Sequence, residues 1–78
     1  MQNVERRVHI VFADNVTPEL DANNLRNNDL IDSYVLDVDA FIEDFEDEFK
    51  VLIDFDQFNT FKTIGDIVLW TESKNEIA

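Results

Sequence analysis

The sequence predicts a small all-α protein in which three helices and a fourth, short helix form a bundle with a long first loop. Apolar residues recur at helical spacing in several stretches, and Phe41, Phe45 and Phe49 lie at i, i+4 and i+8 in the longest of them. The chain has 78 residues, the size of one small domain spanning residues 1–78. It has no cysteine, so it must fold by packing or with help from a partner.

The first helix is predicted at residues 4–13, with Asn3 as its N-cap. His9, the single histidine of the chain, lies on this helix and is interpreted as a surface residue without a ligand or catalytic role. The apolar face of the helix consists of Val4, Val8, Val11 and Phe12.

A long connection follows at residues 14–33, rich in Asn and Asp and with Pro18 near its start. These residue types favour turns and local hydrogen bonds to the backbone over helix. A connection of this length in a compact domain is usually functional or held against the core. The apolar residues expected to pin it to the core are Val16, Leu20, Leu25, Leu30 and Ile31.

The second helix is predicted to begin at Val35 or Val38 and to end at Phe49. Either Ser33 or Asp37 is its N-cap. Its apolar stripe is widened by Val38, Ile42 and Leu52. The opposite face is almost entirely carboxylate, with Asp37, Asp39, Glu43, Asp44, Glu46, Asp47 and Glu48.

Residues 54–61 are predicted to contain one short helical turn whose phenylalanines belong to the core. Residues 63–66 resemble a capping box that starts the last helix, from Ile64 to Ser73, and residues 74–78 are expected to fray. Its inward positions are predicted to be Ile64, Ile67, Val68 and either Leu69 or Trp70. The core of the whole domain is predicted to hold Val8, Phe12, Phe41, Ile42, Phe45, Phe49, Phe61, Ile64 and Val68.

The net charge is −12 at pH 7, and much of it lies on the second helix. Nucleic acid is not expected as a direct partner, because its phosphates would be repelled. A basic protein surface is the expected partner, and the simpler alternative is that the charge only keeps the domain soluble. No apolar run approaches the length of a membrane span, and the first residues lack the apolar region of a signal peptide, so we expect a cytoplasmic protein.

Two stretches resemble the acyl carrier protein family. Residues 30–34, Leu-Ile-Asp-Ser-Tyr, look like the motif around the carrier serine, and residues 41–70 are similar to the acidic second helix of the family and the segments after it. The resemblance implies a four-helix bundle in which Ser33, at the start of the second helix, carries a 4'-phosphopantetheine arm transferred from coenzyme A. The phosphate of the arm would lie near the first amides of that helix, where the helix dipole favours an anion.

A protein of this family holds an acyl or aminoacyl group as a thioester on the arm and performs no catalysis itself. The implied partners are a pantetheinyl transferase and acyl- or aminoacyl-handling enzymes with basic docking surfaces, and the implied oligomeric state is a monomer. The acidic residues expected to guide such partners are Asp32, Asp37, Asp39, Glu43, Asp44 and Asp47.

The register of the second helix leaves an alternative open. When residues 41–49 are aligned with the family without gaps, the position of the carrier serine falls on Val35 rather than Ser33. Either the helix has gained two residues after the serine, or the carrier serine is lost. In the second case the domain is a carrier-like binding module without the arm.

Other function classes have weaker support in the sequence. An enzyme is not expected, because Ser33 has no evident base and His9 lies on another helix without an orienting partner. A metal site is not expected either, because the Asp pairs at 37/39 and 54/56 lack the glycine and the spaced ligands of a calcium loop. The remaining alternative is an acidic binding protein, such as an immunity protein or an inhibitor that mimics the charge of nucleic acid.

Overall fold

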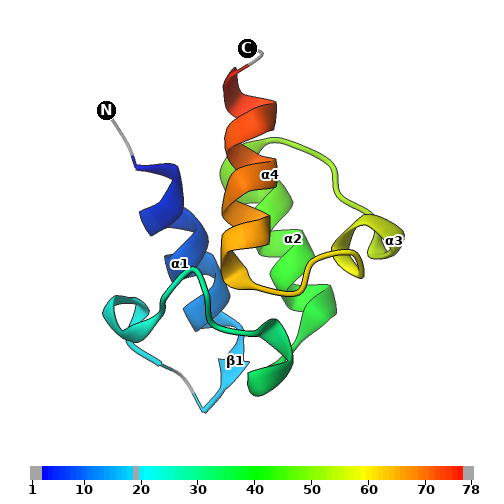
Figure 1. Cartoon of the computed structure of the whole chain (residues 1–78). Coiled ribbons are helices and arrows are strands. Elements are labelled where there is room, and N and C mark those ends of the chain that lie inside the picture. Colours follow the sequence, from blue (N-terminus) through cyan, green and yellow to red (C-terminus); the bar gives the residue numbers. More distant parts are fainter. Residues whose placement is uncertain (1–2, 19, 77–78) are drawn as a thin grey trace.

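The computed structural model describes residues 3–18 and 20–76, and most of these residues are helical (Figure 1). Four α-helices are present in this part of the chain: α1 (Val4–Asp14), α2 (Val38–Phe49), α3 (Phe55–Phe58) and α4 (Ile64–Glu76). Two short 3-10 turns, η1 (Ala22–Asn24) and η2 (Ile31–Ser33), interrupt the long connection. The predicted helices are therefore all present, and α4 continues three residues beyond the predicted end at Ser73.

The expectation of an all-α fold needs one correction, because two short strands pair in an antiparallel arrangement. Strand β1 (Val16–Thr17) pairs with β2 (Val35–Leu36), with Val16 opposite Leu36 and Thr17 opposite Val35. Three of these four residues are β-branched, which suits extended backbone. Next to the pair, the Asp37 amide donates to the Asn15 carbonyl at 2.9 Å, so the end of α1 is joined to the start of α2.

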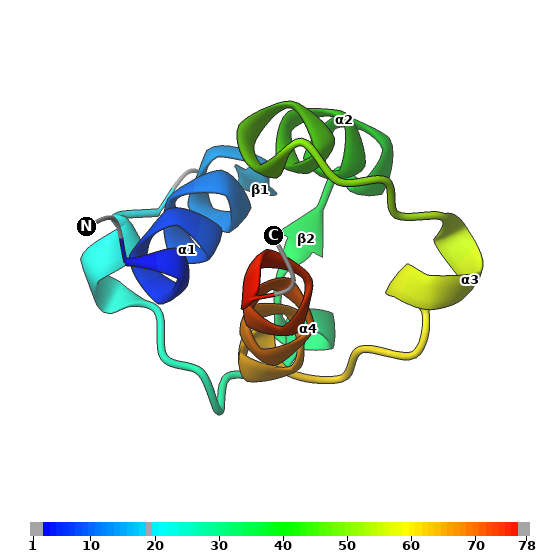
Figure 2. The ribbon, with the colours of Figure 1, turned by 90° about the horizontal axis from the view of Figure 1, so that it is seen from above.

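The three long helices surround a common core. Viewed from above in Figure 2, α1 and α2 lie beside α4, and α3 lies on the side of the molecule away from α1. The long connection crosses back to α4, where the Ile31 amide donates to the Lys62 carbonyl at 2.9 Å and the Ile64 amide donates to the Asp29 carbonyl at 3.1 Å. These bonds fix the later end of the connection, and the pairing of β1 with β2 fixes its start.

Aromatic rings fill the centre of the core. The Phe41 ring lies 5.9 Å from Phe12 of α1 and 5.7 Å from Phe58 of α3, measured between ring centroids. The Phe45 ring lies 6.1 Å from the ring of Trp70 on α4. Contacts of this kind contribute about 0.5–1.5 kcal/mol each beyond the burial of area. One connected set of rings therefore joins all four helices.

Most of the predicted core is confirmed. Ile42 and Phe61 were expected in the core but are only half-buried, and Leu52 is 87% exposed because it lies beyond the end of α2. At the end of the apolar stripe of α4, Leu69 is exposed and Trp70 is half-buried. The predicted core residues that are buried are Val8, Phe12, Phe41, Phe45, Phe49, Ile64 and Val68.

The long connection is pinned by three of its five apolar residues. Val16, Leu25 and Ile31 are buried, whereas Leu20 and Leu30 are exposed, which contradicts the prediction for those two. The connection packs against α1 and buries residues of α1 that would otherwise be exposed to solvent.

His9 is one of these residues, and its predicted place at the surface is wrong. Its side chain is only 7% exposed, because the connection folds over this part of α1. Its Nε2 lies 2.8 Å from the Asn27 side-chain oxygen, which can only accept, so Nε2 donates the hydrogen bond. His9 therefore helps to fix the connection on α1.

Two predicted N-terminal caps, those of α1 and α4, are confirmed. Asn3 accepts from the Arg6 amide at the start of α1, as predicted. The capping box at α4 is confirmed as well: the Thr63 hydroxyl accepts from the Asp66 amide, and the Asp66 carboxylate accepts from the Thr63 amide. The pKa of Asp66 is lowered mainly by hydrogen bonds from the amides of Lys62 and Thr63.

Phe45 is fully buried and contacts the rings of Phe41, Phe49 and Trp70, so its truncation tests the packing. Phe45→Ala is expected to lower the free energy of unfolding by about 3–5 kcal/mol, because it leaves a cavity among the rings. Leu52→Ala is the matched control and is expected to change it by less than about 0.5 kcal/mol, since Leu52 is exposed. Urea denaturation measures both, and equal effects of the two variants would contradict this packing.

Candidate functional site

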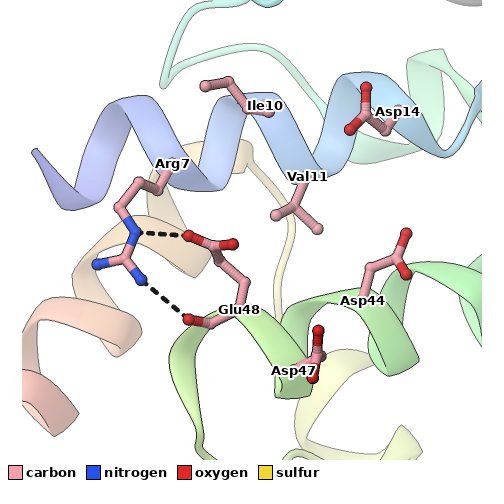
Figure 3. A pocket seen from close by; sticks show the side chains of 7 residues that line it. All are labelled: Arg7, Ile10, Val11, Asp14, Asp44, Asp47 and Glu48. Carbon is pink, nitrogen blue, oxygen red and sulfur yellow. Dashed lines mark hydrogen bonds and ion pairs between the residues drawn. The ribbon is translucent and has the colours of Figure 1, made fainter.

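A groove of about 400 Å³ lies between α1 and α2, and acidic side chains surround it (Figure 3). Helix α1 contributes positions 7, 10, 11 and 14, which share one face of a helix at i, i+3, i+4 and i+7. Helix α2 contributes positions 44, 47 and 48, which share a face in the same way. The lining residues are Arg7, Ile10, Val11, Asp14, Asp44, Asp47 and Glu48.

Arg7 closes one end of this groove. Its Nε donates to Oε2 of Glu48 at 2.7 Å, and its Nη2 donates to the backbone carbonyl of Glu48 at 2.9 Å (Figure 3). The guanidinium also lies 4.5 Å from the ring centroid of Phe49. A cation at the C-terminal end of a helix is favourable, and here it ties α1 to the end of α2. The charge of Arg7 is therefore already engaged within the protein.

Asp14, Asp44 and Asp47 give the rest of the groove its negative charge. All three are exposed, and Oδ2 of Asp44 accepts from the Asn15 side-chain amide at 3.1 Å. Asp47 lies 3.5 Å from the ammonium of Lys50, but both side chains are mostly exposed, so water screens this pair. The rim therefore keeps acceptors that face solvent.

The apolar part of the groove comes from α1. Val11 is almost completely buried and points toward α2, whereas Ile10 remains 40% exposed on the flank (Figure 3). An apolar surface next to carboxylates suits long cationic side chains, because their methylene stems pack on apolar atoms while their charged ends reach the carboxylates. This combination favours the side chains of lysine and arginine.

Only two of the six predicted partner-binding residues, Asp44 and Asp47, line this groove. Asp39 and Glu43 are exposed on α2 but do not line it. Asp32 is exposed on η2, six residues before the first residue of α2, and does not line the groove either.

Two acidic residues of the second helix have structural roles instead. Asp37 is the N-cap of α2, where its Oδ1 accepts from the Ala40 amide at 3.2 Å. Glu46 is half-buried, and its Oε2 accepts from the Ile53 amide at 2.9 Å, which holds the segment after α2. Neither carboxylate is therefore simply part of a solvated acidic face.

Sequence reasoning missed Asp14 and the contribution of α1 to the groove. The signal was present, because residues 7, 10, 11 and 14 follow one helical face that is partly separate from the buried one. The sequence does not show that this face lies beside the carboxylates of α2. That pairing depends on the packing of the two helices.

Ser33 does not occupy the expected place at the start of α2. It is exposed on η2, and residues 34–37 separate it from the first residue of α2, Val38. The pairing of β2 with β1 draws residues 35–36 into extended backbone, so α2 begins only after its Asp37 cap. Val35, the alternative carrier position, lies on β2 and also precedes the helix.

Tyr34 anchors the segment that carries Ser33. Its hydroxyl donates to Oδ2 of Asp29 at 3.0 Å, and its ring packs edge-on against Phe12 with centroids 5.5 Å apart. Burial raises the pKa of the Tyr34 hydroxyl, and the hydrogen bond to the Asp29 carboxylate raises it further. The path of the chain before α2 is therefore fixed by side-chain contacts.

Protein-family models, curated proteins and solved structures were all compared with this chain, and none of them matches it. Within residues 3–18 and 20–76, no helix has the length and apolar character needed to cross a membrane. The same residues hold no group of three or more His, Cys, Asp or Glu side chains that could bind a metal ion.

The crowding of carboxylates on α2 predicts a stabilising response to salt. Glu43 has a like charge four residues away on each side, Asp39 and Asp47, and each such pair costs about 0.2–0.5 kcal/mol. Added sodium chloride is expected to raise the Tm of the protein, because it screens this repulsion. Glu43→Gln is expected to raise the free energy of unfolding by about 0.4–1 kcal/mol at low salt and to reduce the response to salt.

Asp32→Asn is the control for Glu43→Gln, because it removes one exposed carboxylate that lies outside α2. Thermal unfolding at several salt concentrations should show the response of this control to be close to that of the unchanged protein. If the melting temperature of the unchanged protein stays constant or falls with added salt, repulsion between the carboxylates of α2 does not limit its stability.

Proposed function

We propose that this protein is a non-catalytic binding domain that docks a basic segment of a partner protein in the groove between α1 and α2. The observation that carries the proposal is a groove in which four carboxylates surround an apolar surface while its single cation is already paired with Glu48. The carboxylates that remain exposed at the rim offer acceptors to lysine and arginine side chains.

The charge of the whole chain supports a basic protein partner. At −12, the chain attracts positively charged surfaces from a distance and raises their rate of encounter. The groove then gives the encounter a fixed position, because the exposed side chain of Ile10 offers an apolar surface to the aliphatic parts of the docked side chains. The same charge repels nucleic acid phosphates, so a nucleic acid is a poor occupant.

A binding role also fits the chemical groups in the groove better than an enzymatic one. The lining residues include no hydroxyl, thiol or imidazole group that could act as a nucleophile or base beside the carboxylates. Its carboxylates are open to water, whereas acid–base catalysis favours groups held in perturbing surroundings. A partner held by charge needs neither feature.

A synthetic peptide with lysines and leucines at helical spacing tests the proposal. Fluorescence anisotropy should show it binding to the unchanged protein and binding about fivefold more weakly to Asp44→Asn/Asp47→Asn, which removes two rim carboxylates. The control, Asp32→Asn/Asp56→Asn, removes the same charge outside the groove. It is expected to change the affinity by less than about twofold at physiological salt, because screening weakens distant charges.

The matched charge makes this comparison decisive. Equal losses of affinity in the two double variants would mean that the peptide responds only to net charge, and the groove would then not be the docking site.

A carrier role at Ser33 is a second candidate, and the exposure of Ser33 on η2 favours it. In this case the hydroxyl receives 4'-phosphopantetheine from coenzyme A, and the arm presents an acyl or aminoacyl group to partner enzymes. The acidic surface of α2 then guides the basic transferase to the serine. The position of Ser33 ahead of β2 rather than at the start of α2 weighs against this role.

Intact mass measurement separates the two functions. The protein is incubated with coenzyme A and a promiscuous pantetheinyl transferase, and a binding domain is expected to keep its mass. A carrier gains one phosphopantetheine, loses this gain in Ser33→Ala and retains it in Ser73→Ala, which removes an exposed serine of α4. A gain in mass that depends on Ser33 would contradict the proposed binding domain and support the carrier role.

A further inference from the structure

A second groove, of about 250 Å³, lies between the first half of α1 and the connection, and it gathers positive charge on a strongly acidic chain. Arg6 and Arg26 line it together with His9, and among the described residues Glu5 is the one carboxylate that lines it. The chain has only six lysine and arginine residues, so two of them in one groove are a marked local concentration.

Both guanidinium groups converge on one neutral residue. Nη1 of Arg6 donates to the side-chain oxygen of Asn23, and Nη1 of Arg26 donates to the backbone carbonyl of Asn23 at 3.3 Å. Within the described part of the chain, neither guanidinium lies within 4.0 Å of a carboxylate oxygen. Two like charges are thus held near each other by neutral acceptors, although carboxylates outnumber cations on this protein by 18 to 6.

The back of the groove is fixed by hydrogen bonds. The Asn27 side chain accepts from His9 and donates to Oε1 of Glu5 at 3.2 Å, so both of its polar ends are engaged. The Asn27 carbonyl accepts from the Gly65 amide at 2.7 Å, which attaches the connection to α4. The groove is consequently held by three segments that are distant in sequence.

We propose that this groove binds a phosphate-type oxyanion between Arg6 and Arg26. Each guanidinium has five N–H donors and uses few of them within the protein, so each keeps donors for a tetrahedral anion. Arginine matches the geometry of phosphate oxygens through paired hydrogen bonds. The groove is open to solvent, so the anion is either free inorganic phosphate or the phosphate of a monoester whose other end extends outward.

Nuclear magnetic resonance titration tests the proposal on the full chain. Inorganic phosphate is added at constant ionic strength, with chloride as the balancing anion, and backbone amide shifts are followed. Saturable shifts are expected for Asn23, Arg26 and Asn27. Arg6→Gln and Arg26→Gln are each expected to weaken binding about tenfold, because each removes a charge-assisted contact.

Lys62→Gln is the matched control, because it removes one positive charge from a residue that does not line the groove. Its affinity for phosphate is expected to stay within about twofold of the unchanged protein. Methyl phosphate in place of phosphate distinguishes the two sources: tighter binding of methyl phosphate indicates a monoester, and weaker binding indicates the free ion.

Two results would overturn the site. One is the absence of saturable shifts in the groove up to about 20 mM phosphate, a concentration well above the range of a specific small-anion site. The other is an equal loss of affinity in Lys62→Gln and Arg26→Gln, which would mean that phosphate responds only to net charge. Because the groove between α1 and α2 is not involved, either result leaves the docking of a basic partner untouched.

Discussion

The packing of Phe41, Phe45 and Phe49 against the other helices is the constraint on which the rest of the structure depends. These three rings all point into the core, and the ring of Phe45 lies 4.8 Å from that of Phe49. They fix the rotation of α2 about its own axis, so most of the carboxylates between them face outward, whereas Glu46 is half-buried. The acidic groove with α1 exists because this rotation places Asp44, Asp47 and Glu48 beside the exposed flank of α1.

The same packing stabilises α2 against the repulsion between its carboxylates. Like charges on one helix destabilise it by a few tenths of a kcal/mol per pair, and the buried rings offset this cost. Arg7 reduces the repulsion at one end through its two hydrogen bonds to Glu48. The remaining carboxylates of the groove stay exposed, as the proposed docking of a basic partner requires.

The helices, the caps of α1 and α4 and most of the core could be predicted from the sequence, because each depends on local spacing. The cap of α2 could not, since Ser33 and Asp37 are both suitable cap residues and only the structure identifies Asp37. The two-residue strands could not, since pairing of Val16 with Leu36 depends on contacts between distant segments. The burial of His9 was missed for the same reason. Gly65 is a further example. A Cβ at this position would lie 2.9 Å from the Asn27 carbonyl oxygen, so the close approach of the connection to α4 requires glycine. The sequence contains the glycine but does not show that Asn27 lies against it.

A charge exchange tests most directly the claim that a basic partner docks in the groove between α1 and α2. Asp44→Lys/Asp47→Lys reverses the charge of two residues at the rim of the groove and leaves the packed rings of α2 unchanged. In a second version of the synthetic peptide, glutamates replace the lysines. The reversed protein is expected to lose the basic peptide and to bind the acidic one, because the new charges face each other in the same place. If the reversed protein binds neither peptide, or keeps its affinity for the basic one, the groove between α1 and α2 is not where a charged partner docks.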